Sequence, residues 1–211
     1  MRQPSMVVLL VINARNCQEW LNRVDQRISD LNTLKTAIGL YITTTPTPLL
    51  NNVSGNVGCK ATAAGARALG GTEKIYYSYP TESGAINDAN MDGATTTPKV
   101  QVAQASYTKT DGTGWLPINF SGITGGSPIS SLPIDPTNTL VSPDVITSVT
   151  NASLMYRYSC AISPLTYELD AVLESEAYTV TDKKMETDGG NNASYYETGT
   201  NMFILGATAT F

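Results

Sequence analysis

The side chains most able to do chemistry are acidic and gather near the C-terminus. From Glu168 to Glu197 the chain carries eight acidic residues and only two lysines. Within this stretch, Asp188-Gly-Gly-Asn-Asn192 and the later Glu197 place hard oxygen ligands on a glycine-rich backbone, which suits Ca²⁺. The spacing differs from that of an EF-hand, and a plain turn between two strands is the alternative interpretation. The candidate calcium ligands are Asp188, Asn191, Asn192 and Glu197.

Composition excludes several other kinds of site. The chain has no histidine, which removes the Ser-His-Asp and Cys-His catalytic units and any histidine-ligated zinc or haem site. The 13 basic and 18 acidic residues give a net charge of -5, so a basic footprint for nucleic acid is not expected.

One pair of carboxylates remains to be considered as a catalytic pair. Glu168 and Asp170 are two residues apart in a strand pattern whose Tyr167 and Leu169 point the other way. We expect them on a solvated strand face rather than as the acid and base of a glycoside hydrolase. The chain is therefore expected not to be an enzyme.

Three cysteines, Cys17, Cys59 and Cys160, are too few and too widely spaced for a metal cluster. A cytosolic protein would keep them as thiols, whereas an exported one could pair two of them. Cys17 falls in a helical stretch, while Cys59 and Cys160 fall in the part of the chain that has a globular pattern. A disulfide between Cys59 and Cys160 is the candidate pairing, and two buried free thiols are the alternative.

The clearest element is a helix over residues 21–41. Apolar residues recur there in steps of three and four, while Arg23, Arg27, Asp30 and Lys35 fall off the apolar stripe, as in an amphipathic helix. The Thr- and Pro-rich run 43–48 should end it. Seven apolar residues, 6–12, precede it, far fewer than the roughly 20 that a membrane span needs. The predicted packing stripe is Leu21, Val24, Ile28, Leu31, Leu34, Ile38 and Tyr41.

After residue 42 the pattern changes from helical periodicity to alternation among Thr, Ser, Gly and Asn. Extended segments are predicted over 100–107, 115–120, 154–160, 167–173 and 202–205. Pro117 should make the segment 115–120 an edge strand or an irregular one. Residues 122–136 and 188–192 are rich in turn formers. The expected fold is α+β, with a helix in residues 1–42 that packs on an antiparallel sheet with long loops in residues 43–211.

Several segments, in this order along the chain, resemble bacterial type IV pilin-like proteins and type II secretion pseudopilins. The longest is Gln26-Arg-Ile-Ser-Asp-Leu-Asn-Thr-Leu-Lys-Thr-Ala-Ile-Gly-Leu-Tyr41, which is similar to the helix of that family. The others are Gly114-Trp-Leu-Pro117, Ser131-Leu-Pro-Ile-Asp-Pro136, Tyr156-Arg-Tyr158, Tyr167-Glu-Leu-Asp-Ala-Val-Leu-Glu-Ser175, Asp188-Gly-Gly-Asn-Asn192 and Tyr196-Glu-Thr-Gly199.

The resemblance implies a pilin-like fold and a non-catalytic subunit of a type IV pilus-like filament or a secretion pseudopilus. Its partners would be copies of itself and other pilins, at the cell surface or outside the cell. A full-length precursor would be anchored in the inner membrane before assembly. Major pseudopilins bind calcium in a C-terminal loop, so the resemblance also favours the calcium ligands named above.

The start of the chain departs from the family pattern. The glycine-phenylalanine processing site and most of the apolar helical segment that follows it are absent, and the chain has only the run Met6 to Ile12. Membrane contact would then depend on a missing or upstream apolar segment. This departure favours the alternative function, a surface adhesin or ligand-binding domain that keeps a pilin fold without polymerising.

Overall fold

The computed structural model describes residues 6–62, 74–78, 85–86, 99–100, 102, 105–137, 148–149 and 154–206. Its longest element is helix α1, Met6–Thr44, with 39 residues. The predicted segment 21–41 lies inside it, and the helix ends before Pro46, as the Thr- and Pro-rich run predicts. Thr43 and Thr44 turn their hydroxyls back onto carbonyls of the last turn. Among the described residues, no helix combines the length and the apolar content that crossing a membrane would require.

The main sheet has five strands, in the order β3-β1-β5-β6-β7. Strands β1, β5, β6 and β7 pair antiparallel, and the edge strand β3 pairs parallel to β1. A separate parallel pair joins β2 to β4. The strands are β1 Ile75–Tyr77, β2 Ala85–Ile86, β3 Lys99–Val100, β4 Ser148–Val149, β5 Tyr156–Ala161, β6 Thr166–Ala171 and β7 Tyr196–Gly199. The α+β class is therefore the fold class of the structure.

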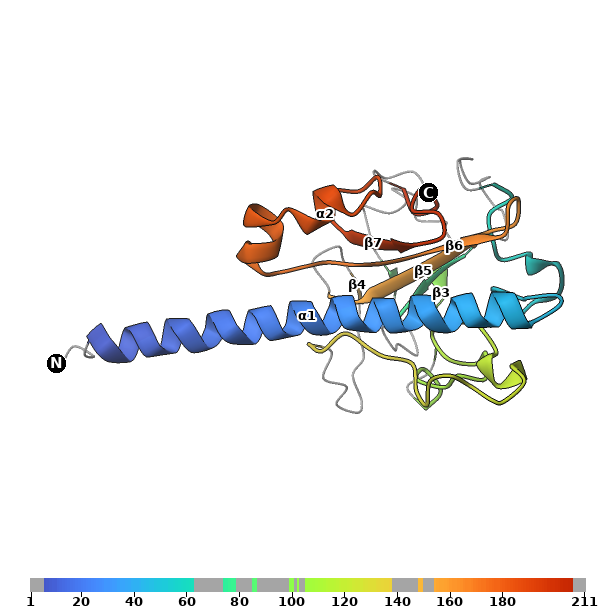
Figure 1. The fold of residues 1–211 in the computed structure, drawn as a ribbon, viewed down its shortest axis with the longest axis horizontal. Coiled ribbons are helices and arrows are strands. Elements are labelled where there is room, and N and C mark those ends of the chain that lie inside the picture. The colour runs from blue at the N-terminus through green and yellow to red at the C-terminus, as the bar shows by residue number, and fades with distance from the viewer. Residues whose placement is uncertain are drawn as a thin grey trace.

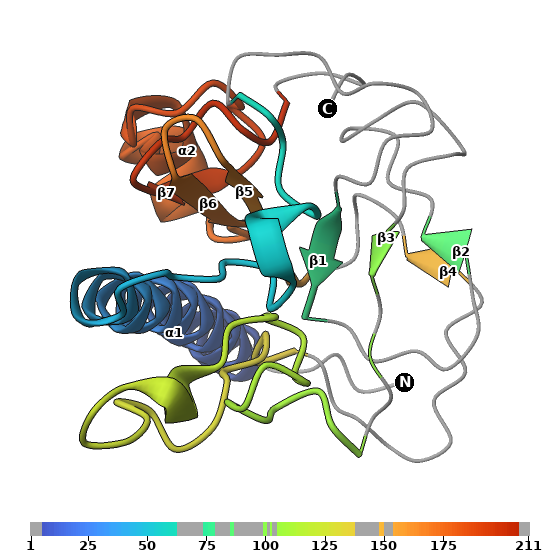
Figure 2. The ribbon, with the colours of Figure 1, turned by 90° about the vertical axis from the view of Figure 1, so that its right-hand side faces the viewer.

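Four short helical turns complete the described elements: η1 Ser54–Asn56, η2 Phe120–Gly122, the π-helical η3 Ala177–Thr181 and α2 Lys184–Thr187. Figure 2 looks along α1 and shows that it lies between two parts of the chain. The segment 105–137 lies on one side of α1, and strands β6 and β7 lie on the other.

Some predicted strands are confirmed and others are wrong. The predictions over 154–160 and 167–173 correspond to β5 and β6. The segment 202–205 forms turns, and the strand β7 lies a few residues earlier. The segment 115–120 is buried and irregular, one of the two forms expected because of Pro117, with a single bridge between Asp111 and Asn119. Of the predicted strand 100–107, Val100 lies in β3 and residues 105–107 form a turn, while 101, 103 and 104 lie outside the described residues.

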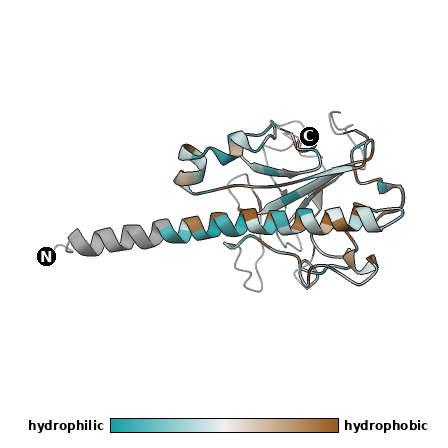
Figure 3. Ribbon diagram, in the orientation of Figure 1, coloured by the Kyte–Doolittle hydropathy of each residue, from teal (hydrophilic) through white to brown (hydrophobic). Residues whose placement is uncertain are grey.

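The apolar stripe of α1 packs on one face of the sheet. Val24, Leu31, Leu34, Ile38 and Tyr41 are buried, and Leu21 and Ile28 are half-buried. Figure 3 shows the alternation of hydrophobic and hydrophilic residues along this half of the helix. The stripe meets the sheet residues Tyr156, Tyr158, Cys160, Tyr167, Leu169 and Ala171. Cys59 and Cys160 form a disulfide within this core, the pairing favoured by the sequence.

Candidate functional site

Charged side chains of α1 form a second set of contacts with the rest of the protein. The Arg27 guanidinium donates two hydrogen bonds to Asp135, of 2.6 and 3.0 Å. Both side chains are fully buried. The Nη1 atom of Arg27 also lies 3.4 Å from Glu174, which pairs with Arg23 as well. Burial by itself would lower the pKa of Arg27, but the bonds to Asp135 outweigh it and raise that pKa.

A buried carboxyl group lies one turn further along the helix. Tyr156 of β5 donates its hydroxyl to Asp30 at 2.7 Å, and Gln26 donates to the other oxygen of Asp30 at 2.6 Å. Burial raises the pKa of Asp30, although both hydrogen bonds oppose that rise. Further on, Lys35 donates to the hydroxyl of Thr198 in β7. The helix is thus fixed to the sheet by polar contacts as well as by its apolar stripe.

These contacts correct one expectation. Arg27 and Asp30 were expected to lie off the packing face, but Arg27 is fully buried and Asp30 is 9% exposed. Arg27 follows Val24 by three residues and precedes Leu31 by four, so helical spacing itself places it beside the stripe. That spacing is the signal that could have identified Arg27. No comparable signal in the sequence points to Asp135.

The face of the sheet that points away from α1 is buried and charged. Arg157 of β5 pairs with Asp170 of β6 through two hydrogen bonds, and neither side chain is exposed. The Arg157 guanidinium also stacks on the Tyr195 ring, 3.2 Å from its centroid. Glu168 and Glu197 lie on the same face, at 0% and 1% exposure. The expectation that Glu168 and Asp170 form a solvated face is therefore wrong.

The reason is that a further piece of chain covers this face. The C-terminal segment, residues 200–206, follows β7, and the backbone N–H groups of Ile204 and Leu205 both donate to Glu168 at 2.7 Å. The buried Lys60 donates to the carbonyl of Ile204. Alternation along a strand indicates which residues share a face, but it does not indicate whether a later segment covers that face.

The four calcium candidates form a loop held by its own hydrogen bonds. The two carboxylate oxygens of Asp188 accept the backbone N–H groups of Gly190 and Glu197. Glu197 accepts the N–H of Asn192 and turns toward Glu168. The Asn192 side chain bonds to Ser194 and to Gly206. Of the candidate oxygens, one of Asn191 and one of Glu197 have no hydrogen-bond partner.

This arrangement does not fit a calcium site. Calcium takes six to eight oxygen ligands that converge on one point, whereas the oxygens of Asp188 and Asn192 are directed at backbone groups of the loop itself. Within the described residues, no three His, Cys, Asp or Glu side chains cluster so that they could hold a metal ion. Residues 188–192 form a turn between α2 and β7.

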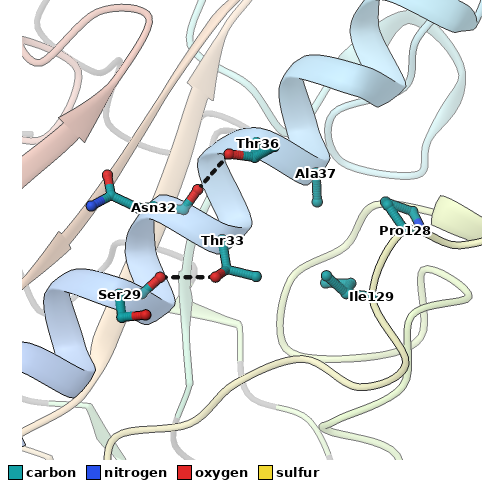
Figure 4. A pocket seen from close by; sticks show the side chains of 7 residues that line it. All are labelled: Ser29, Asn32, Thr33, Thr36, Ala37, Pro128 and Ile129. Carbon is teal, nitrogen blue, oxygen red and sulfur yellow. Dashed lines mark hydrogen bonds between the residues drawn. The ribbon is translucent and has the colours of Figure 1, made fainter.

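An open groove lies along the exposed side of α1, with a volume of about 410 Å³. Figure 4 shows its helical wall, where Thr33 and Thr36 donate their hydroxyls to the carbonyls of Ser29 and Asn32. Pro128 and Ile129 form the opposite wall. None of the described residues that line the groove has an ionisable side chain.

Comparisons of the chain with models of protein families, with curated proteins and with solved structures find no match.

Proposed function

We propose that the chain is a non-catalytic structural subunit of an extracellular filament, of the type IV pilus or type II secretion pseudopilus kind. One observation carries the proposal: α1 is much longer than the part of it that packs on the sheet. With a rise of about 1.5 Å per residue, a helix of this length extends about 60 Å. Its N-terminal part projects beyond the rest of the molecule, as Figure 1 shows.

A projecting helix needs a partner. Isolated helices are marginally stable in water, and this one begins with the apolar run Met6–Ile12. Helices of other copies would cover that run in a filament, with the sheet domains on the outside. The polar contacts of Arg27 and Asp30 would hold each domain at a fixed place on its helix.

Other observations agree with an assembly outside the cell. The disulfide between Cys59 and Cys160 is of a kind that persists in oxidising compartments. Charged residues make up only 15% of the chain, which suits surfaces that pack against copies of themselves. The resemblance of residues 26–41 to pilin helices points to the same type of assembly.

Electron microscopy of sheared surface filaments, labelled with an antibody against this chain, tests the proposal. Labelling along the filaments would identify a major subunit, and labelling at the tips a minor one. Cells whose chain carries Leu10→Glu in the apolar run should lose the labelled filaments. Asn22→Glu, at an exposed position of the same helix, is the matched control and should keep them.

If the antibody detects the chain at the cell surface but labels no filament, the result contradicts the proposal and favours the alternative, an adhesin or ligand-binding domain. Unchanged filaments in cells with Leu10→Glu would show that the projecting helix does not assemble them.

A further inference from the structure

Two buried oxygen atoms on the charged face of the sheet lack a hydrogen-bond donor. They are Oε1 of Glu168 and Oε1 of Glu197. The other oxygen of Glu168 accepts two backbone N–H groups, from Ile204 and Leu205. The other oxygen of Glu197 accepts the N–H of Asn192 at 2.8 Å. The two carboxyl groups lie close enough to influence each other's pKa, and two ionised carboxylates have no proton with which to bond to each other.

The strand register explains why these two groups meet. Glu168 lies opposite Gly199, and Asp170 lies opposite Glu197. Glu168 and Glu197 are therefore diagonal neighbours on one face of an antiparallel pair, within reach of long side chains. Position 199 holds a glycine, and a Cβ there would collide with the backbone of Tyr167.

Several charged groups surround the pair Glu168 and Glu197. Asp170 is neutralised by Arg157, which also stacks on Tyr195. Lys60, in the segment before β1, donates to the carbonyl of Ile204. The carboxylate of Asp188 accepts the backbone N–H of Glu197. The two oxygens without a donor, one on each glutamate, can both be satisfied by a single proton held between them.

We propose that Glu168 and Glu197 share one proton and that this proton acts as a pH-sensitive latch, which holds the C-terminal segment (residues 200–206) over the sheet. Loss of the proton leaves two adjacent buried carboxylates, and their repulsion is relieved when the segment opens and admits water. The segment is the natural part to open because it is bound through Glu168, Lys60 and Asn192.

The direction of the pH dependence follows from burial. Burial, the hydrogen bond to Glu197 and nearby negative charges raise the pKa of Glu168 well above its usual value of 4.5. Burial also raises the pKa of Glu197. The closed state then holds one more proton than the open state, so its stability is fully present below pH 4.5 and falls as pH rises through the raised pKa.

Hydrogen exchange measured by NMR tests the latch on the intact chain. Within the window between the two pKa values, the protection factors of the Ile204 and Leu205 amides should fall about tenfold for each pH unit, since opening releases one proton. The amide of Leu169, central in the sheet, should not follow this slope. Side-chain carbonyl shifts of Glu168 and Glu197 should show that the pair keeps one proton above pH 4.5, the usual pKa of a glutamate.

Variants separate the proton from simple packing. Glu168→Gln places an amide where the shared proton was, so it should keep the segment protected and remove the pH slope. Glu197→Gln should have the same effect, and it replaces Glu168→Gln in the test if that variant does not fold. Glu186→Gln, at an exposed position, is the control and should behave like the unmodified chain.

Three results would overturn the latch. The first is a pair whose carboxyl groups are both ionised as soon as the pH exceeds 4.5, the usual pKa of a glutamate. The second is a pH slope that survives in both glutamine variants. The third is a loss of protection on adding EDTA at constant pH, because a metal ion and not a proton would then lie between the carboxylates.

Discussion

At the scale of single residues, the carboxyl group of Glu197 fits only because a glycine lies against it. A methyl group at Gly190 would collide with Oε2 and Cδ of Glu197. The Glu197 side chain is buried and bound to Asn192, so it cannot move aside freely. Gly190→Ala should therefore lower the free energy of unfolding by about 1–3 kcal/mol, the usual cost of overpacking. Urea denaturation followed by circular dichroism measures the change.

Gly39→Ala is the matched control for that substitution. Gly39 lies inside α1 with nothing within 4 Å of the added methyl group. Alanine is a better helix former than glycine by about 1 kcal/mol, so this variant should be as stable as the unmodified chain or more stable. A Gly190→Ala variant that is as stable as Gly39→Ala would mean that Glu197 has room to move.

At the scale of elements, the attachment of α1 depends on a buried ion pair. Arg27→Met keeps most of the apolar stem but leaves Asp135 buried without its partner. Removing one member of a buried pair typically costs about 3–5 kcal/mol, and the loss should appear as a lower midpoint of urea denaturation. Arg23→Met, at a position that is 27% exposed, should cost no more than about 1 kcal/mol.

A second variant shows whether the charge or the shape of Arg27 matters. In Arg27→Met with Asp135→Leu, both partners become apolar, and such replacements are often neutral or stabilising. The double variant should recover most of the loss of Arg27→Met. A double variant as unstable as the single one would mean that Arg27 acts through packing and not through its pairing with Asp135.

Local periodicity predicted the elements whose pattern is strong. The three- and four-residue spacing of α1 and the alternation around Tyr167 and Leu169 identified a helix and β6 correctly. Strand β7 was not predicted because Tyr196-Glu-Thr-Gly199 has no apolar alternation. Residues 202–205 are mostly apolar and were predicted as a strand, but they form turns, and two of their backbone N–H groups bond to Glu168. Strand pairing, not local composition, decides where such short strands lie.

The charged face was missed for a different physical reason. Arg157, Glu168 and Asp170 look exposed in the sequence because charged residues are seldom fully buried unless they are paired. Their pairing depends on the register between β5 and β6, which places Arg157 opposite Asp170. Their burial depends on the return of residues 200–206 over the sheet. Neither fact is encoded in the local pattern around these residues, so a sequence reading assigns them to solvent.

At the scale of the whole molecule, one covalent bond joins distant parts of the chain. Cys59 lies beyond α1 and Cys160 lies in β5, 101 residues later, and both are buried. In the chain-entropy model, closing a loop of this length restricts the unfolded chain enough to stabilise the fold by about 4–5 kcal/mol. The disulfide thus links the segment after the helix to the centre of the sheet.

Replacing both cysteines, Cys59→Ala with Cys160→Ala, should therefore lower the free energy of unfolding by about 4–5 kcal/mol, with some further loss from the two buried sulfurs. Chemical denaturation of both proteins measures the difference, and under reducing conditions only the smaller loss from the two buried sulfurs should remain. Thiol titration of the unfolded, unreduced chain should find one free cysteine, Cys17. Three free thiols would show that the bond does not form, and the stabilisation assigned to loop closure would then have to come from packing in the core around β5.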